Sequence, residues 1–301
     1  MTPPRRVLRN ATYLITRRCS ERRFFLRPSA KTNAILEYAL AVAAKRHGIQ
    51  VHAYVFLGNH YHLLVTDPEA RVCDFVRDLN SLIARSLNAE IGHWEHFWDA
   101  ARTSIVRLVE ADDIAEKMVY TLANPVSSGL VDSGRKWPGL RRGPRDLLRP
   151  ARCAQRMGRL FGKRSSSPPA VDFELSKAPG FEDLTTEEYV ELIEERVEER
   201  ERGLREEARA AGRKFLGRKA ILTQEPHDRP RSREPRRKLD PKVACRNPAK
   251  RILALRELKG FVKSYREALD EFRSGLREAF FPLGTWSMRV RLAVNCHGGS
   301  G

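Results

Sequence analysis

The chain has 301 residues, which is enough for one sizeable core and a second region. Lysine and arginine number 56 against 38 aspartate and glutamate, so the formal net charge is +18, which suits a polyanionic partner such as nucleic acid. The five cysteines are scattered without a C-x-x-C pair and no apolar stretch reaches 18 residues, which argues against a zinc cluster, a disulfide scaffold and a membrane span, and predicts a cytoplasmic location.

The first predicted elements are strands and one amphipathic helix. Residues 11–18 predict a strand, and residues 24–28 predict a short strand returning beside it. From Thr32 to His47 apolar residues recur at helical spacing, and Gly48 is a typical helix end.

A hairpin and two further helices follow. Residues 49–67 predict two strands joined by a turn at Gly58 and Asn59, and residues 72–87 predict a helix. Residues 103–109 predict a strand, after which Asp113 and Glu116 resemble a capping box that starts a third helix. Strands and helices therefore interleave around a mostly antiparallel sheet, which predicts an α+β fold with a ferredoxin-like, or RRM-like, βαββαβ pattern.

The composition changes after about residue 150. We predict one folded domain over 1–150, a linker over 151–181 and a charged, mainly helical, partly disordered extension over 182–301. Residues 182–207 hold twelve acidic and four basic side chains and predict a solvated helix. Residues 213–256 hold fifteen basic and four acidic side chains and predict an extended basic segment, with a last helix from Ile252.

Two histidines stand two residues apart in the predicted second hairpin strand. Side chains at i and i+2 share one face of a strand, so His60 and His62 lie together, while Tyr61, Leu63 and Val65 face the helices. Such a pair is more often structural than metal-binding when it is taken alone. The pair is therefore interpreted together with the helix that follows.

The predicted third helix is the natural cover for the histidine face. Its apolar stripe excludes Tyr120, which shares the opposite side with Glu116 and, one turn later, Asn124. Pro125 disfavours helical geometry at Asn124, so the helix is expected to end there. A tyrosine off the apolar stripe favours an exposed or functional hydroxyl.

A tyrosine, two imidazoles and an amide oxygen suit phosphodiester chemistry. A tyrosine hydroxyl is a poor nucleophile at neutral pH, but it can attack a phosphodiester when a cation draws charge from the phosphate. Neutral nitrogen and oxygen ligands leave coordination positions open for phosphate oxygens. We expect magnesium or manganese, and zinc would also suit the histidines.

These residues resemble a known family. "YVFLGNHYHLLV", followed about sixty residues later by "YTLANPVSSGLV", is similar to the REP-associated tyrosine transposases of the HUH endonuclease superfamily, over roughly residues 5–145. The resemblance implies that His60, His62 and Asn124 bind the metal and that Tyr120 is the nucleophile. It also implies cleavage and rejoining of single-stranded DNA at hairpins through a 5′-phosphotyrosine intermediate.

Other expectations concern binding and alternatives. The chain is expected to act as a monomer or homodimer on hairpin-bearing single-stranded DNA. A non-catalytic DNA- or RNA-binding module on the same fold is the main alternative, and a related relaxase or rolling-circle initiator is another. Candidate DNA contacts are Arg17, Arg18, Arg102, Arg107, Arg236, Arg237 and Lys238.

Overall fold

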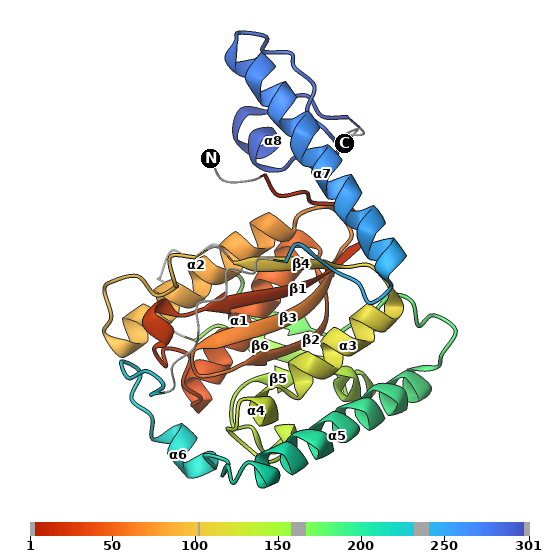
Figure 1. Cartoon of the computed structure of the whole chain (residues 1–301). Helices are drawn as coiled ribbons and strands as arrows, with labels where there is room; N and C mark the ends of the chain where they lie inside the picture. The colour runs from red at the N-terminus through yellow and green to blue at the C-terminus, as the bar shows by residue number, and fades with distance from the viewer. Residues whose placement is uncertain (1–3, 102, 158–166, 232–240, 298–301) are drawn as a thin grey trace.

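A six-stranded sheet occupies the centre of the computed structural model, which describes residues 4–101, 103–157, 167–231 and 241–297 (Figure 1). Its strand order is β5-β2-β3-β1-β4-β8, and every pairing is antiparallel except the parallel pair β4–β8. The strands are β1 (Ala11–Arg18), β2 (Gln50–Phe56), β3 (His60–Asp67), β4 (Ser104–Leu108), β5 (Arg141–Arg142) and β8 (Val243–Ala244).

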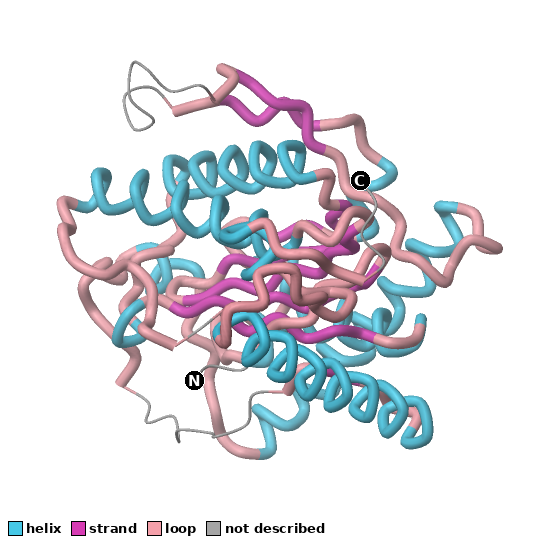
Figure 2. The backbone as a smooth tube through the Cα atoms, turned by 90° about the horizontal axis from the view of Figure 1, so that it is seen from above, coloured by secondary structure: helices cyan, strands magenta, loops and turns pink. Residues whose placement is uncertain are grey.

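Helices cover both faces of this sheet (Figure 2). Side chains alternate along β3, so Tyr61, Leu63 and Val65 pack against α1 and α2, while Leu64 packs against α3 on the opposite face. The helices are α1 (Ala30–His47), α2 (Val72–Ile91), α3 (Ala111–Leu122), α4 (Asn124–Ser127), α5 (Thr186–Ala210), α6 (Arg218–Leu222), α7 (Pro248–Arg273) and α8 (Ser287–Leu292). Short 3₁₀ helices cover Ser20–Arg22, Gly134–Lys136 and Pro144–Leu148.

The predicted α+β fold is confirmed in the first half of the chain. The elements β1-α1-β2-β3-α2-β4 follow one another in the predicted order, and their strands stand in the order β2-β3-β1-β4 within the sheet. Gly48 ends α1 with a φ of 63°, in the left-handed region that glycine adopts readily. The hairpin turns at Gly58 and Asn59, where the Leu57 amide donates to the His60 carbonyl at 2.8 Å.

Two local predictions were wrong. Residues 24–28 form no strand: the Leu26 amide makes a single bond, at 2.9 Å, to the Gly58 carbonyl of the hairpin turn. The third helix starts at Ala111 because Asp113 accepts a hydrogen bond from the Glu110 amide at 3.1 Å. Asp113 therefore closes a cap with Glu110, three residues before it, and not with Glu116.

The second half is largely helical, as predicted, but several of its described segments pack against the first half. The range predicted as a linker contains a two-stranded sheet, β6 (Arg152–Gln155) and β7 (Ala170–Phe173), whose apolar side chains join the core beside α1. The charged helix α5 is not solvated on all sides. Tyr189, Ile193 and Val197 are buried against α3.

The basic segment also lies against the first half where it is described. The Arg107 amide on β4 donates to the Lys242 carbonyl at 2.9 Å, and the Arg246 amide donates to Asp113 at 2.7 Å. The helix α7 then extends away from the sheet, and α8 lies beside it (Figure 1). In the described part of the chain, no helix combines the length and apolar character needed to cross a membrane.

Candidate metal and tyrosine site

The histidine pair lies on β3, between β2 and β1, on the face that α3 covers. In the β1–β3 register, Thr16 stands opposite His62 and Arg18 stands opposite His60. The His60 and His62 rings are perpendicular, with centroids 5.0 Å apart. The predicted sharing of one face is therefore confirmed.

His62 is the buried member of the pair, with 4% of its surface exposed. Its Nδ1 lies 2.8 Å from the Thr16 hydroxyl, whereas its Nε2 is buried without a hydrogen-bond partner among the described residues. Burial, together with the neighbouring His60 and Arg18, holds the pKa of His62 well below its usual value. The imidazole is therefore neutral, as a metal ligand must be.

His60 is held by its own chain neighbour. Its Nδ1 lies 2.7 Å from Asn59 Oδ1, and the Asn59 amide nitrogen donates to the Arg22 carbonyl at 3.1 Å. Because that second bond orients the amide, Asn59 presents its oxygen to His60, and the oxygen can only accept. In a neutral ring the His60 hydrogen therefore lies on Nδ1, and the lone pair lies on Nε2.

Tyr120 lies beside His62. Ile114, Ala115, Met118 and Leu122 attach α3 to the sheet and to α5, which leaves the Tyr120 side chain 44% exposed. Its ring centroid is 5.2 Å from that of His62, in an edge-on arrangement. The structure thus brings the predicted tyrosine and the histidine pair together.

Asn124 follows one turn later, where α3 gives way to α4 before Pro125. It is buried, and its Oδ1 accepts a hydrogen bond from the Ser128 hydroxyl at 3.1 Å. The predicted end of the helix at Asn124 was wrong in detail: α3 ends two residues earlier, at Leu122, and Asn124 is the first residue of the short helix α4, where Pro125 is accommodated in the first turn. The second lone pair of Oδ1 keeps the capacity to bind a cation.

These residues fit a divalent cation. The imidazoles of His60 and His62 both have Nδ1 held by a protein oxygen, and imidazole nitrogens and the amide oxygen of Asn124 are ligand types that manganese, magnesium or zinc can bind. The tie of His62 to Thr16 was missed at the sequence level, because it depends on the register between β1 and β3. Asn59 could have been noticed as the residue preceding His60.

A second group of ligating atoms lies at the start of α3. Glu110, Asp113 and Cys245 place one ligand atom each within 4.8 Å of one another, and this group could also hold a metal ion. Lys250 pairs with Glu110, and the Arg246 amide donates to Asp113. Desolvation, assisted by Asp113 and Glu110, raises the pKa of Cys245 to about 11, so its thiol is protonated. These contacts join α7 to α3.

The predicted DNA-contacting arginines occupy different environments. Arg18 is exposed on the histidine face, beside His60. Arg17 points to the opposite face, where its guanidinium lies 5.8 Å from the centre of the Trp98 ring. Arg107 pairs with Glu257 of α7 at 3.5 Å. The remaining candidates, Arg102, Arg236, Arg237 and Lys238, lie outside the described residues.

Two solved structures are similar to part of this chain. The REP-associated tyrosine transposase bound to a REP hairpin has 20% sequence identity and a TM-score of 0.42 over 50% of this chain and 87% of that chain. A putative transposase from Deinococcus radiodurans has 20% identity and a TM-score of 0.29 over 40% of this chain and 95% of that chain. No protein-family model matches the chain, and no curated protein matches it. At these values neither similarity defines the function.

Proposed function

We propose that this protein is a metal-dependent single-strand DNA endonuclease and strand transferase with Tyr120 as nucleophile. His60, His62 and Asn124 hold the cation, and the substrate is single-stranded DNA that carries a hairpin. The observation that carries the proposal is the buried His62 Nε2, which lacks a partner among the described residues and belongs to a ring whose centroid is 5.2 Å from that of Tyr120. A buried polar atom without a partner is costly unless a ligand satisfies it.

The bound cation would polarise the scissile phosphate and neutralise charge as the bond to the nucleophile forms. Tyr120 is exposed and close to the two rings that would hold the cation, so its hydroxyl can approach that phosphate. Its oxygen bonds to phosphorus and its proton passes to water, while the bond from phosphorus to the 3′ oxygen breaks. The 3′ oxygen takes a proton from water and leaves as a hydroxyl, and the 5′ phosphate stays on the tyrosine.

Other tyrosines near the site are poor alternatives. Tyr54 and Tyr61 are fully buried, and burial raises the pKa of both hydroxyls far above the usual value. Tyr61 also donates to Asn80 Oδ1 at 2.8 Å, on the face of the sheet away from the histidines. Only Tyr120 combines exposure with contact to the histidine pair among these three.

The test is covalent capture of DNA. Wild-type protein, incubated with manganese and a labelled hairpin-bearing single strand, is expected to give an adduct that survives denaturing electrophoresis. Tyr120→Phe should give none while keeping its DNA affinity within a few-fold, because only a hydroxyl is lost. Tyr265→Phe, on the distant helix α7, is the matched control and should form adduct normally.

Two results would contradict the proposal. Adduct from Tyr120→Phe would assign another nucleophile. Tight DNA binding by the wild type without any adduct would favour the alternative, a non-catalytic nucleic-acid-binding module, which the net charge of +18 also suits.

A further inference from the structure

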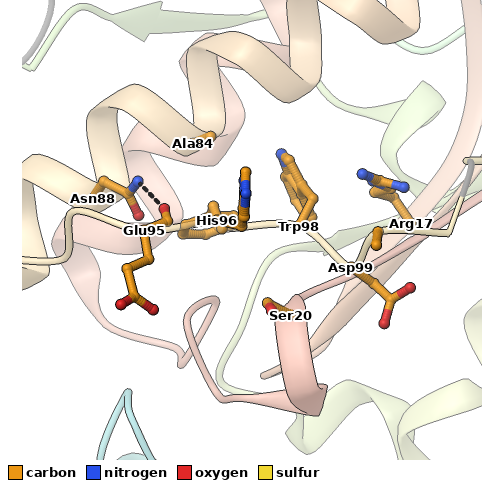
Figure 3. Close-up of a pocket in the computed structure, with 10 residues that line it drawn as sticks. Arg17, Ser20, Ala84, Asn88, Glu95, His96, Trp98 and Asp99 are labelled. Carbon is orange, nitrogen blue, oxygen red and sulfur yellow. Dashed lines mark hydrogen bonds between the residues drawn. The ribbon is translucent and has the colours of Figure 1, made fainter.

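A hollow lies on the face of the sheet opposite the histidines. It has a volume of about 540 Å³ and opens between the end of β1, the last turns of α2 and the segment 95–100 (Figure 3). Pockets that bind small organic groups span about 300–1,000 Å³, so it has room for one nucleotide. The Asp99 amide donates to the Arg18 carbonyl at 3.0 Å, and Arg18 stands opposite His60. The hollow and the histidine pair therefore lie on opposite faces of the sheet, near the end of β1.

One wall of this hollow is aromatic. The indole of Trp98 is fixed by its bond to the Asn80 carbonyl at 2.9 Å, and the Arg17 guanidinium lies 5.8 Å from its ring centre. The His96 ring stands beside Trp98, and His96 is exposed at the rim (Figure 3). Flat rings and a guanidinium plane of this kind are the surfaces on which unpaired bases stack.

The polar groups in the hollow are mostly hydrogen-bond acceptors. The Asn88 amide nitrogen donates to the Glu95 carbonyl at 3.3 Å, which leaves its Oδ1 buried and without a partner among the described residues. Asp99 uses Oδ1 to accept from the Ala101 amide at 2.7 Å, and the Glu95 carboxylate lies at the rim. Two carboxylates repel a phosphate, but they accept hydrogen bonds from the amino group of a base.

We infer that this hollow binds one unpaired nucleobase carrying an exocyclic amino group, held within a single DNA strand. The base stacks against His96 and Trp98, and Asp99 and Asn88 accept its N–H groups. This inference rests on the proposed function for the identity of the strand. It adds a base-binding site on the face of β1 opposite the histidine pair and Tyr120.

The test measures binding, not cleavage, and uses the full chain carrying Tyr120→Phe. A hairpin-bearing single strand is given an abasic site at each unpaired position in turn, and affinity is measured by fluorescence anisotropy at one salt concentration. One position is expected to lose roughly five- to a hundredfold in affinity, the range typical of one stacked base. Adding His96→Ala should remove that position's dependence to within twofold.

A matched control comes from the same segment. Trp94 is 94% exposed and does not line the hollow, so Trp94→Ala should keep the full abasic effect. Asp99→Asn should abolish the preference for an amino-bearing base over thymine at the critical position. The inference is overturned if His96→Ala and Trp94→Ala give the same abasic profile at every position.

Two further measurements complete the test. One distinguishes a base within a strand from a free nucleotide, and the other distinguishes failure of this inference from failure of the proposed function. A deoxynucleoside monophosphate should not displace the strand at equal concentration, and binding as tight as that of the strand would overturn the assignment to a base within a strand. The adduct assay on the wild type reports independently on the proposed function. If affinity depends on one base through His96 but no adduct forms, only the proposed cleavage reaction is refuted. If the adduct forms but affinity depends on no single base, only the proposed base-binding role of the hollow is refuted.

Discussion

Residues 1–150 and 151–301 contribute differently to the same site. The first half supplies the sheet core and all four residues of the candidate site, on β3, α3 and α4. The second half packs around this core: α5 lies on α3, β8 extends the sheet beyond β4, and the β6–β7 sheet lies against α1. The position of Tyr120, the proposed nucleophile, therefore depends on both halves, although all the proposed site residues lie in the first half.

Helix α3 shows this most directly, because it is packed on two sides. Met118 lies in the core beneath the helix, and its sulfur is 3.4 Å from the hydroxyl of Tyr189 on α5. A chain cut after residue 150 would expose this second apolar side of α3 to water. The domain boundary near residue 150 remains a proposal, but the two parts share a hydrophobic core.

The largest effect is expected for the proposed cation ligands, which all lie in the first half of the chain. His62→Ala, or His60→Ala, should reduce cleavage by a thousandfold or more, because loss of Lewis-acid catalysis typically costs several kcal/mol. Asn124→Ala should be milder, because water can replace an amide oxygen. Single-turnover adduct formation against manganese concentration measures each effect.

A histidine in the second half is the control for this prediction. His297 is exposed and packs only on Phe280 among described aromatic rings, so His297→Ala should cleave normally. Unchanged metal dependence in the His60→Ala, His62→Ala double variant would remove the metal site from the proposal.

The site was predictable from sequence where it rests on local patterns. The alternation of His60 and His62 with apolar residues placed both histidines on one strand face, and the helical spacing around Tyr120 placed that side chain off the apolar stripe. What could not be predicted depends on pairing between distant segments. Thr16 meets His62 only through strand register, and β8 is two residues long and exists only beside β4.

Helix α5 shows why the packing of the second half on the first was not predicted from the sequence. Its buried residues in the first three turns, Tyr189, Val190, Ile193 and Val197, form a narrow stripe that is flanked by charged side chains. Such a helix has the composition of a solvated one, and its burial depends on the long apolar face that α3 offers. Glu201 continues the stripe and is buried because its carboxylate accepts the Gly134 amide at 2.9 Å.

The second prediction tests the packing of α5 against α3. Ile193→Ala should lower the free energy of unfolding by about 2–5 kcal/mol, because it removes buried methylenes and leaves a cavity. Glu195→Ala, at an exposed position of the same helix, should change it by no more than about 0.5 kcal/mol. Denaturant unfolding measures both, with hydrogen exchange of the sheet amides as a second probe. Loss of α5 in a separate transition, with the sheet unaffected, would show that the halves fold independently.

A smaller effect is expected at the tie between β1 and β3. Thr16→Val keeps the shape of the side chain but removes the hydroxyl that holds His62 Nδ1, so manganese affinity should fall about 10- to 100-fold. Thr16→Ser keeps the hydroxyl and should stay near the wild type. Calorimetric titration with manganese measures the difference. Equal affinities for the two variants would show that Thr16 does not position the ligand.

The smallest effect is expected on α7, the part of the second half that extends from the sheet (Figure 1). Leu253 is 58% exposed, so Leu253→Ser should change the free energy of unfolding by no more than about 0.5 kcal/mol. Ile252 and Leu255 are exposed on the same helix, which makes this region sensitive to association between copies. Sedimentation velocity of both proteins over a range of concentrations therefore accompanies the unfolding measurement. A concentration-dependent dimer that Leu253→Ser dissociates would select the homodimer over the monomer and would give α7 a covering role like that of α5.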